Sequence, residues 1–235
     1  MANSYFHFKQ FTVYQERCAM KVSTEACVLG AWIPKSTAKR ILDIGAGTGL
    51  ISLMLAQRTD AQIDAVEIDP DAATQATDNF ANSPWRDRLH LIPINIFEWD
   101  TKARYDLIVS NPPFFTSSLK SPEAKHNLAK HDTGSFSKQR FAQCLSRLLA
   151  DGGVAYVLYP ETEAEEFSNS CQQIGLHTAE SLIVKNQANK QAVFRVILKI
   201  AHQPILKESQ TLNIRDGEAY TPEFMELLKN YYLKL

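Results

Sequence analysis

The stretch RILDIGAGTGLISLMLAQR, residues 40–58, decides the fold of this 235-residue chain. Three glycines, Gly45, Gly47 and Gly49, separate an apolar run from a segment with helical apolar spacing. Because glycine adopts a positive φ at little cost, the pattern predicts a strand that turns sharply into a helix. Such a turn lets the backbone approach a ligand closely, and the helix presents its positive N-terminal end to it. We therefore expect a nucleoside cofactor at this turn.

The same alternation of strand-like and helix-like segments continues along the chain. We expect strands over 40–44, 62–68, 88–94, 105–110 and 153–159, and helices over 50–58, 70–82, 137–150 and 162–174. Strands that alternate with helices form a parallel sheet. Two strand-like runs, 179–185 and 192–200, follow without a helix between them, which predicts an antiparallel hairpin. The expected fold class is α/β, a Rossmann-like, doubly wound seven-stranded sheet that is mostly parallel and has an antiparallel C-terminal hairpin.

Length and composition fit one large domain. With 45% hydrophobic and 22% charged residues, the chain can bury a continuous core. We expect an N-terminal arm over 1–39, a cofactor-binding and catalytic core over 40–200, and a C-terminal extension over 201–235. The extension should contain a helix, since Thr221 can cap it and Pro222 suits its first position.

Several classes of protein are excluded by what the sequence lacks. The start has no apolar signal region, and no window approaches the ~18 consecutive apolar residues of a membrane span, so we expect a cytoplasmic protein. The cysteines, which are Cys18, Cys27, Cys144 and Cys171, have no metal-binding spacing. We expect them to be reduced thiols, with no disulfide and no metal.

The glycine motif does not match two common nucleotide-binding loops. A dinucleotide fingerprint needs Gly or Ala at its sixth position, where this chain has Leu50, and no G-K-[ST] phosphate loop is present. What remains is D-x-G-x-G-x-G, beginning at Asp43. Glu67 ends the next expected strand about 20 residues beyond the glycines, where a βαβ unit places a ribose-binding carboxylate. The alternatives are a tight turn without a ligand, and an Asp43 that only fixes the loop.

This combination resembles the class I S-adenosylmethionine-dependent methyltransferases. The resemblance implies that the glycine loop lies under the methionine end of the cofactor and that Glu67 binds both ribose hydroxyls. The family commonly has an Asp after the third strand to accept a hydrogen bond from the adenine amine, and here that place is taken by Asn95. Ile68 and Ile96 are placed to press on the two adenine faces. Asn95 can accept the same bond, but a turn-forming Asn is the alternative.

A second motif, SNPPFF at 110–115, follows the strand expected over 105–110. Two prolines cannot continue a strand, and the turn faces the same crevice as the glycine loop. It resembles the [N/D]-P-P-[Y/F/W] motif of methyltransferases that modify a planar nitrogen, a poor nucleophile because its lone pair is delocalised. We expect the Asn111 side-chain oxygen and the Pro112 carbonyl to accept its N–H groups, and Phe114 to stack on the planar group.

Four stretches together resemble a narrower family, the bacterial tRNA(Val) adenine N6-methyltransferases, which act on adenine 37 beside the anticodon. They are FHFKQFTVYQERCAMKVSTEACVLGAW at 6–32, the glycine block, SNPPFF, and LNIRDGEAYTPEF at 212–224. The resemblance implies S-adenosyl-L-methionine as cofactor and tRNA as partner. It also implies that Lys21 and Thr24 in the arm close over the cofactor and substrate pocket.

Charge is distributed unevenly although the net charge is −1. The net charge is +4 over 1–40, −6 over 41–111 and +3 over 112–140. Either the basic segments are solvated faces, or a polyanion approaches them. On the second reading we expect phosphate contacts from Lys120, Lys125, Lys130, Lys138 and Arg140, with help from Lys9 and Arg17.

Other functions remain open from the sequence. A protein glutamine N5-methyltransferase has tyrosine at the position of Phe114 and usually a helical N-terminal domain. An rRNA guanine N2-methyltransferase shares N-P-P-F but is commonly fused to a second copy of the fold, for which 235 residues leave no room. A cofactor-binding RNA scaffold without activity is less favoured because both motifs are intact.

Overall fold

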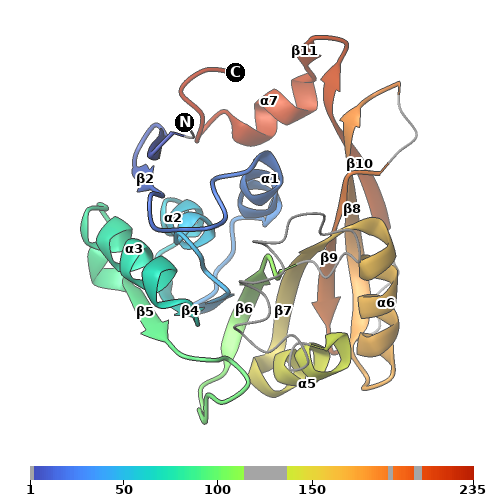
Figure 1. The fold of residues 1–235 in the computed structure, drawn as a ribbon. Coiled ribbons are helices and arrows are strands. Elements are labelled where there is room, and N and C mark those ends of the chain that lie inside the picture. The colour runs from blue at the N-terminus through green and yellow to red at the C-terminus, as the bar shows by residue number, and fades with distance from the viewer. Residues whose placement is uncertain (1–2, 114–136, 190–192, 204–207) are drawn as a thin grey trace, which may run out of the picture.

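The computed structural model describes residues 3–113, 137–189, 193–203 and 208–235. Its main strands are β3 (Arg40–Ile44), β4 (Gln62–Glu67), β5 (Leu89–Pro93), β6 (Tyr105–Ser110), β7 (Leu149–Tyr159), β8 (His177–Gln187), β9 (Arg195–Ala201), β10 (Glu208–Asp216) and β11 (Ala219–Tyr220). Within these described ranges they form a nine-stranded sheet in the order β11-β10-β8-β9-β7-β6-β3-β4-β5 (Figure 1). The order reverses direction at β3, which places the glycine loop and the end of β6 at a topological switch point.

The strand pairing confirms the predicted α/β class. β3 pairs in parallel with β4 and β6, and β5 and β7 continue the parallel sheet on either side. β9 is antiparallel to both β7 and β8, as the hairpin prediction requires. The C-terminal extension lengthens the sheet beyond the seven predicted strands, because β10 pairs in parallel with β8 and β11 pairs with β10. β10 is polar, and only Leu212 and Ile214 of it are buried, so it lacks the apolar run of a core strand.

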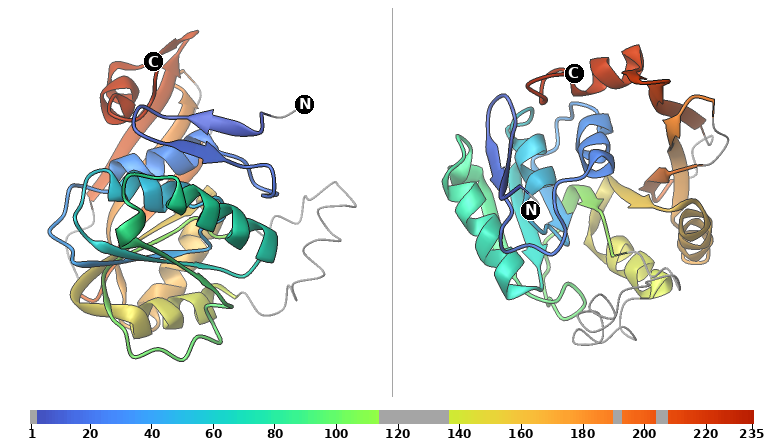
Figure 2. Two further views of the ribbon diagram at one scale, coloured as in Figure 1. Left: turned by 90° about the vertical axis from the view of Figure 1, so that its left-hand side faces the viewer. Right: turned by 45° about the horizontal axis from the view of Figure 1, so that its top comes forward.

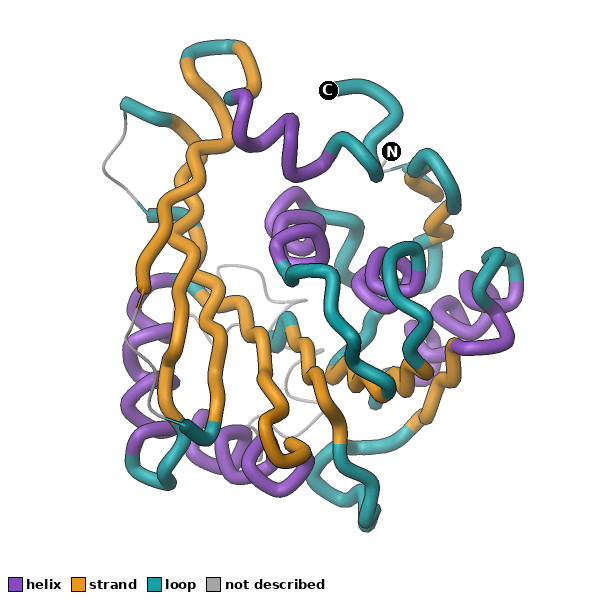
Figure 3. Tube along the Cα trace, turned by 180° about the vertical axis from the view of Figure 1, so that it is seen from behind, coloured by secondary structure: helices purple, strands orange, loops and turns teal. Residues whose placement is uncertain are grey.

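Helices cover both faces of the sheet (Figure 3). They are α1 (Thr24–Trp32), α2 (Leu50–Ala56), α3 (Pro70–Ala81), α5 (Lys138–Leu148), α6 (Glu161–Gln172), α7 (Pro222–Leu228) and a short 3-10 helix, η1 (Arg86–Arg88). Adjacent strand residues point to opposite faces. Ile41 belongs to the core beneath α1, α2 and α7, whereas Leu42 belongs to the core beneath α5 and α6.

The N-terminal arm has more structure than the sequence predicted. It contains a hairpin of β1 (Tyr5–His7) and β2 (Thr12–Tyr14) followed by α1. The hairpin lies above α2 and α3 in the left view of Figure 2. Phe8 bridges to Tyr232 near the C-terminus, and the Lys9 backbone N–H donates to the Tyr231 carbonyl at 2.8 Å. The arm and the C-terminal tail are thus fastened to each other.

Two further properties concern the helices and the cysteines. In the part of the chain that is described, no helix is long and apolar enough to cross a membrane. All four cysteines are free and buried, and burial raises the pKa of Cys18 to about 11 and that of Cys27 to about 12. Burial likewise raises the pKa of Cys144 and Cys171, which favours the protonated thiol at neutral pH.

Candidate functional site

The glycine loop joins β3 to α2 in a conformation that requires glycine. Gly45, Gly47 and Gly49 have φ values of 73°, 55° and 78°. A Cβ added at Gly45 or Gly47 meets nothing within 4 Å, whereas one at Gly49 would lie 2.4 Å from a ring carbon of Phe80. The first two glycines therefore line open space that a ligand can enter, and the third permits the close packing of α2 against α3.

Glu67, at the end of β4, is bound to the glycine loop. Its Oε2 accepts a hydrogen bond from the Gly47 N–H at 2.8 Å, and its Oε1 accepts one from the Asp69 N–H at 2.9 Å. The side chain is buried, with 8% of its surface exposed. Each carboxylate oxygen has a second lone pair, so Glu67 can hold the loop and still accept ribose hydroxyls. The sequence predicted the ribose contact, and the structure adds the support of the loop.

Asp43 is fully buried at the end of β3. Its Oδ2 accepts hydrogen bonds from the backbone N–H and the hydroxyl of Ser52, at 3.1 and 2.7 Å, and so fixes the first turn of α2. Its Oδ1 is buried without a hydrogen-bond partner. Burial raises the pKa of Asp43 to about 7, the bonds from Ser52 oppose this rise, and nearby Glu67 adds to it. An unpaired buried oxygen of this kind fits a ligand that carries N–H donors or positive charge.

The residues predicted to hold adenine lie beyond the ends of β4 and β5. Ile68 is 50% exposed, an unusual exposure for isoleucine that suits stacking on a base. Ile96 is instead buried in the core beneath α5. Asn95 forms a turn, since its Oδ1 accepts from the Phe97 N–H at 3.1 Å and its Nδ2 donates to Glu98 at 3.0 Å. Contacts from Asn95 and Ile96 to adenine stay predictions.

The N-P-P turn lies beside the glycine loop. Ser110 pairs with Ile44, and its hydroxyl donates to the Ile44 carbonyl at 2.8 Å. The next residue, Asn111, has a buried Oδ1 with no hydrogen-bond partner, and its Nδ2 lies 3.9 Å from Sδ of Met20. Pro112 is buried. Phe114 lies outside the described residues. An unused acceptor therefore stands one residue past the strand that adjoins the cofactor loop.

Residues 15–22, here called the arm loop, connect the two halves of the site. Gln15 closes the loop, because its Oε1 accepts from the Val22 N–H at 2.7 Å and its carbonyl accepts from Lys21 Nζ. Arg17 fastens the loop to α3 through an ion pair with Asp78 at 2.9 Å.

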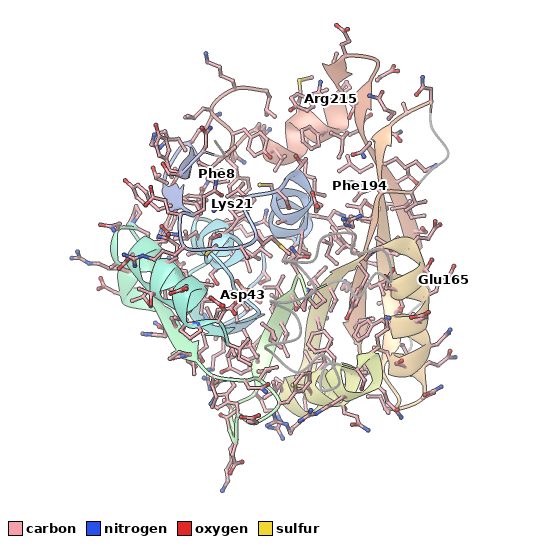
Figure 4. The ribbon with its side chains drawn as sticks, viewed as in Figure 1. Phe8, Lys21, Asp43, Glu165, Phe194 and Arg215 are labelled. Atoms are coloured by element: carbon pink, nitrogen blue, oxygen red, sulfur yellow. The ribbon has the colours of Figure 1, made fainter. Side chains whose placement is uncertain are left out.

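The arm loop adjoins the Asn111 side through Met20. At its start, Asn79 Nδ2 donates to the carbonyls of both Tyr14 and Thr48, which ties the arm to the glycine loop. In Figure 4, Lys21 lies on the same side of α1 as Asp43. Thr24 begins α1 and lines a separate cleft with Phe194 and Arg215.

The predicted phosphate contacts divide into two groups. Lys120, Lys125 and Lys130 lie outside the described residues. Of the others, Lys138 pairs with Glu166 at 2.7 Å, and the Arg140 guanidinium lies over the Phe97 ring at 4.5 Å. Lys9 Nζ donates to the Lys229 carbonyl. Phosphate binding by these residues stays a prediction.

Within the described ranges, no three His, Cys, Asp or Glu residues are grouped to hold a metal ion.

Comparisons with known proteins identify the fold and the family. Residues 18–140 match the family model described as Methyltransferase small domain. Among solved structures, a putative class I S-adenosylmethionine-dependent methyltransferase from Listeria monocytogenes has a TM-score of 0.61 at 16% identity, and the alignment covers 92% of this chain and 71% of that one. A predicted O-methyltransferase from Agrobacterium tumefaciens has a TM-score of 0.67 at 17% identity, with 87% and 95% covered. At these identities the likeness concerns the fold.

Curated relatives match over their whole length. A protein named tRNA1(Val) (adenine(37)-N6)-methyltransferase from Dyadobacter fermentans is 44% identical over 99% of this chain and 98% of its own. A protein of the same name from Cytophaga hutchinsonii is 43% identical, with both chains covered completely. The glycine loop, the N-P-P turn and the arm all lie within these alignments. The chain belongs to the tRNA1(Val) (adenine(37)-N6)-methyltransferase family.

Proposed function

We propose that this protein transfers a methyl group from S-adenosyl-L-methionine to the exocyclic N6 of adenine 37 in a valine tRNA. The observation that carries the proposal is the buried, unpartnered Oδ1 of Asn111 beside the glycine loop. A buried acceptor without a partner is costly, so it is expected where a ligand completes its hydrogen bonding. The amino group of adenine offers the donors that this oxygen lacks.

The cofactor half of the site has residues suited to each part of S-adenosyl-L-methionine. Gly45 and Gly47 leave space along the loop, and Glu67 can accept the ribose hydroxyls. Oδ1 of Asp43 is an acceptor suited to the cationic methionine end, and Ile68 offers an exposed apolar surface to the adenine. The bound cofactor supplies a methyl group already activated by the positive sulfur.

The protein then has to make a weak nucleophile reactive. The lone pair of adenine N6 is delocalised into the ring. Oδ1 of Asn111 accepts one N6 proton in a hydrogen bond, and the Pro112 carbonyl accepts the other, which turns the lone pair toward the methyl. Proline suits the second role because it offers no competing N–H. Alignment supplies most of the rate enhancement, and the surplus proton leaves to water after transfer.

Two alternative activities are less favoured. Guanine N2 and glutamine amide nitrogens are also planar and could be held by an N-P-P turn. The arm loop argues for the adenine reading, because it contacts Asn111 through Met20 and lies within the stretch of 6–32 that resembles the tRNA family. Its contact with the target site gives it a role in choosing the acceptor.

The decisive experiment uses purified protein, labelled S-adenosyl-L-methionine and total tRNA. Nucleoside analysis should find N6-methyladenosine, and a valine tRNA transcript with guanine at position 37 should accept no label. Asn111→Ala serves as the control for contaminating activity. Label in N2-methylguanosine or in protein glutamine would refute the adenine assignment and support one of the alternatives.

A further inference from the structure

A cleft of about 350 Å³ opens between the start of α1 and the outer strands of the sheet. We call it the hairpin cleft. Thr24 contributes from α1, Asn186 from the end of β8, Phe194 from the residue before β9, and Arg215 and Tyr220 from the C-terminal extension. In Figure 4, Phe194 and Arg215 lie on one side of α1, and Lys21 and Asp43 lie on the other. None of the cofactor-loop residues lines it.

The hairpin cleft lies at the same end of the strands as Asn111. Ser110 pairs with Val157 of β7, and two residues later Tyr159 pairs with Val196 of β9. β9 therefore starts at the level that the chain reaches at Pro112. Strands are spaced by about 4.8 Å, so β9 lies about 10 Å from β6 and β10 lies about 19 Å from it. Arg215 pairs with Gln187, four residues beyond Ile183, which pairs with Val196, so the hairpin cleft also lies about 13 Å further along the strand direction. At this separation from Asn111 the cleft suits a nucleotide a few positions away from a bound target base.

Two guanidinium groups lie over aromatic rings in this region. The Arg215 guanidinium lies 4.2 Å above the Tyr220 ring and donates a hydrogen bond to the Glu218 carbonyl. Tyr220 is supported on Phe224, with ring centroids 4.8 Å apart. Arg195 lies 4.5 Å from the Phe194 ring centre and also pairs with a carboxylate at α1. A guanidinium held in one plane by its hydrogen bond offers its other face to a flat ligand.

The charges in the hairpin cleft favour an anionic ligand. Arg195 is balanced by Glu25, whose Oε1 lies 3.7 Å away. Arg215 bonds to a neutral carbonyl and to a ring, so its positive charge is kept. Asn186 is exposed at the rim and offers an amide that can both donate to and accept from a base edge. Arg215 thus supplies a plane for stacking and a positive charge, and Asn186 supplies an amide. Proteins recognise unpaired RNA nucleotides with groups of these kinds.

We propose that the hairpin cleft binds one unpaired nucleotide of the anticodon loop, a few positions from the target adenine, with its base stacked on the Arg215 guanidinium and its edge read by Asn186. This inference rests on the proposed function. An adenine that enters the N-P-P turn must leave the stack of the anticodon loop, and its neighbours lose their stacking partner. The cleft offers a stacking partner to one unpaired base of the opened loop and holds the loop while the methyl is transferred.

The test measures binding of a fluorescent anticodon stem-loop of valine tRNA to the full-length protein. Arg215→Gln should weaken binding and raise the KM for this RNA about 10-fold, the effect of losing one stacked base, with kcat and cofactor affinity unchanged. Arg104→Gln is the matched control, since Arg104 is exposed just before the first residue of β6, at the opposite end of the strands from Asn111. It removes the same charge and should change binding less than about 2-fold, as a surface charge contributes little. Equal thermal stability of both variants shows that each one folds.

Abasic nucleotides locate the contact. At one unpaired anticodon-loop position a few nucleotides from adenine 37, removal of the base should weaken binding to the wild-type protein about 10-fold and leave binding to Arg215→Gln unchanged. Equal losses in both proteins, or equal effects of Arg215→Gln and Arg104→Gln, would overturn the proposal. Competition by free uridine or adenosine monophosphate, with no effect of any abasic position, would assign the cleft to a free nucleotide instead. A wild-type protein that leaves the stem-loop and full tRNA unmethylated refutes the proposed function separately, because the binding measurements need no activity.

Discussion

Replacing Glu67 with alanine tests both roles that this carboxylate has in the structure. Its two oxygens hold the Gly47 and Asp69 N–H groups at 2.8 and 2.9 Å, and we propose that the same oxygens accept the ribose hydroxyls. The first role affects the free protein, and the second appears only when cofactor binds. The two can therefore be measured separately on one variant.

The magnitudes follow from the hydrogen bonds. A hydrogen bond to a charged group contributes about 1.5–3 kcal/mol. The freed N–H groups face a loop where a Cβ at Gly47 would meet nothing within 4 Å, so water can replace the carboxylate. We therefore expect the free protein to lose about 2–3 kcal/mol for both bonds together, which lowers Tm by about 4–12 °C at this chain length. Loss of two ribose contacts should weaken cofactor binding at least about 100-fold.

The assay combines thermal unfolding of the free protein with calorimetric titration of S-adenosyl-L-methionine at a temperature where the variant is folded. Asp71→Asn is the control, because Asp71 is an exposed carboxylate in the first turn of α3. This substitution removes the same charge close to Glu67. It should leave both quantities nearly unchanged. A lower Tm with unchanged cofactor affinity would refute the ribose contact and leave Glu67 as a support of the glycine loop alone.

Three further predictions concern the rest of the site. Asn111→Ala should leave Tm and cofactor affinity nearly unchanged and lower the single-turnover rate about 100-fold or more; a near-normal rate would remove Asn111 from the chemistry. Gly49→Ala should lower the free energy of unfolding by about 2 kcal/mol or more, because the added methyl group meets Phe80. Gly47→Ala should lower it by about 1 kcal/mol and mainly weaken cofactor binding. If both variants had the same effect in thermal unfolding and in cofactor titration, the two glycines would not have these separate roles. The raised pKa of Asp43, about 7, means that the folded protein binds this proton more tightly than the unfolded chain, so its contribution to stability falls as pH rises from about 4 to about 7. A cationic cofactor favours the ionised form, so affinity should rise with pH up to about 7, and titrations at pH 6.5 in two buffers should detect proton release that Asp43→Asn abolishes.

Much of the core could be predicted because its segments depend on local patterns. β3 and β6 have the predicted bounds, and Thr221 caps α7 by accepting from the Phe224 N–H at 3.2 Å. For these strands and this helix, the sequence pattern that predicts the element lies within a few neighbouring residues. An apolar strand closed by glycine or proline, and a threonine before a proline, need no distant partner to be recognised.

The parts that the sequence did not predict depend on distant partners. Every residue from Ala26 to Ala31 of α1 is buried, so this helix has no polar face and no helical period. β10 is mostly polar and is a strand because β8 offers it a partner edge. The support of Gly47 by Glu67 joins residues 20 positions apart, and the closure of the arm loop by Gln15 uses a residue type that marks no motif.

The division between core and arm explains why the two motifs alone specify only a class of reaction. The glycine loop and the N-P-P turn follow neighbouring parallel strands, so the sheet itself brings cofactor and acceptor together, whatever the acceptor is. The arm adjoins both, because Asn79 joins Tyr14, the residue before the arm loop, to Thr48 of the glycine loop, and Met20 lies beside Asn111. It is anchored on α3 by Arg17 and closed by Gln15, so its position is set independently of the catalytic turn. We propose that the arm loop forms a wall shared by both ligands, which can select the acceptor without altering the chemistry. That is why the sequence signal for adenine in tRNA lies in the arm, while the signal for methyl transfer lies in the core.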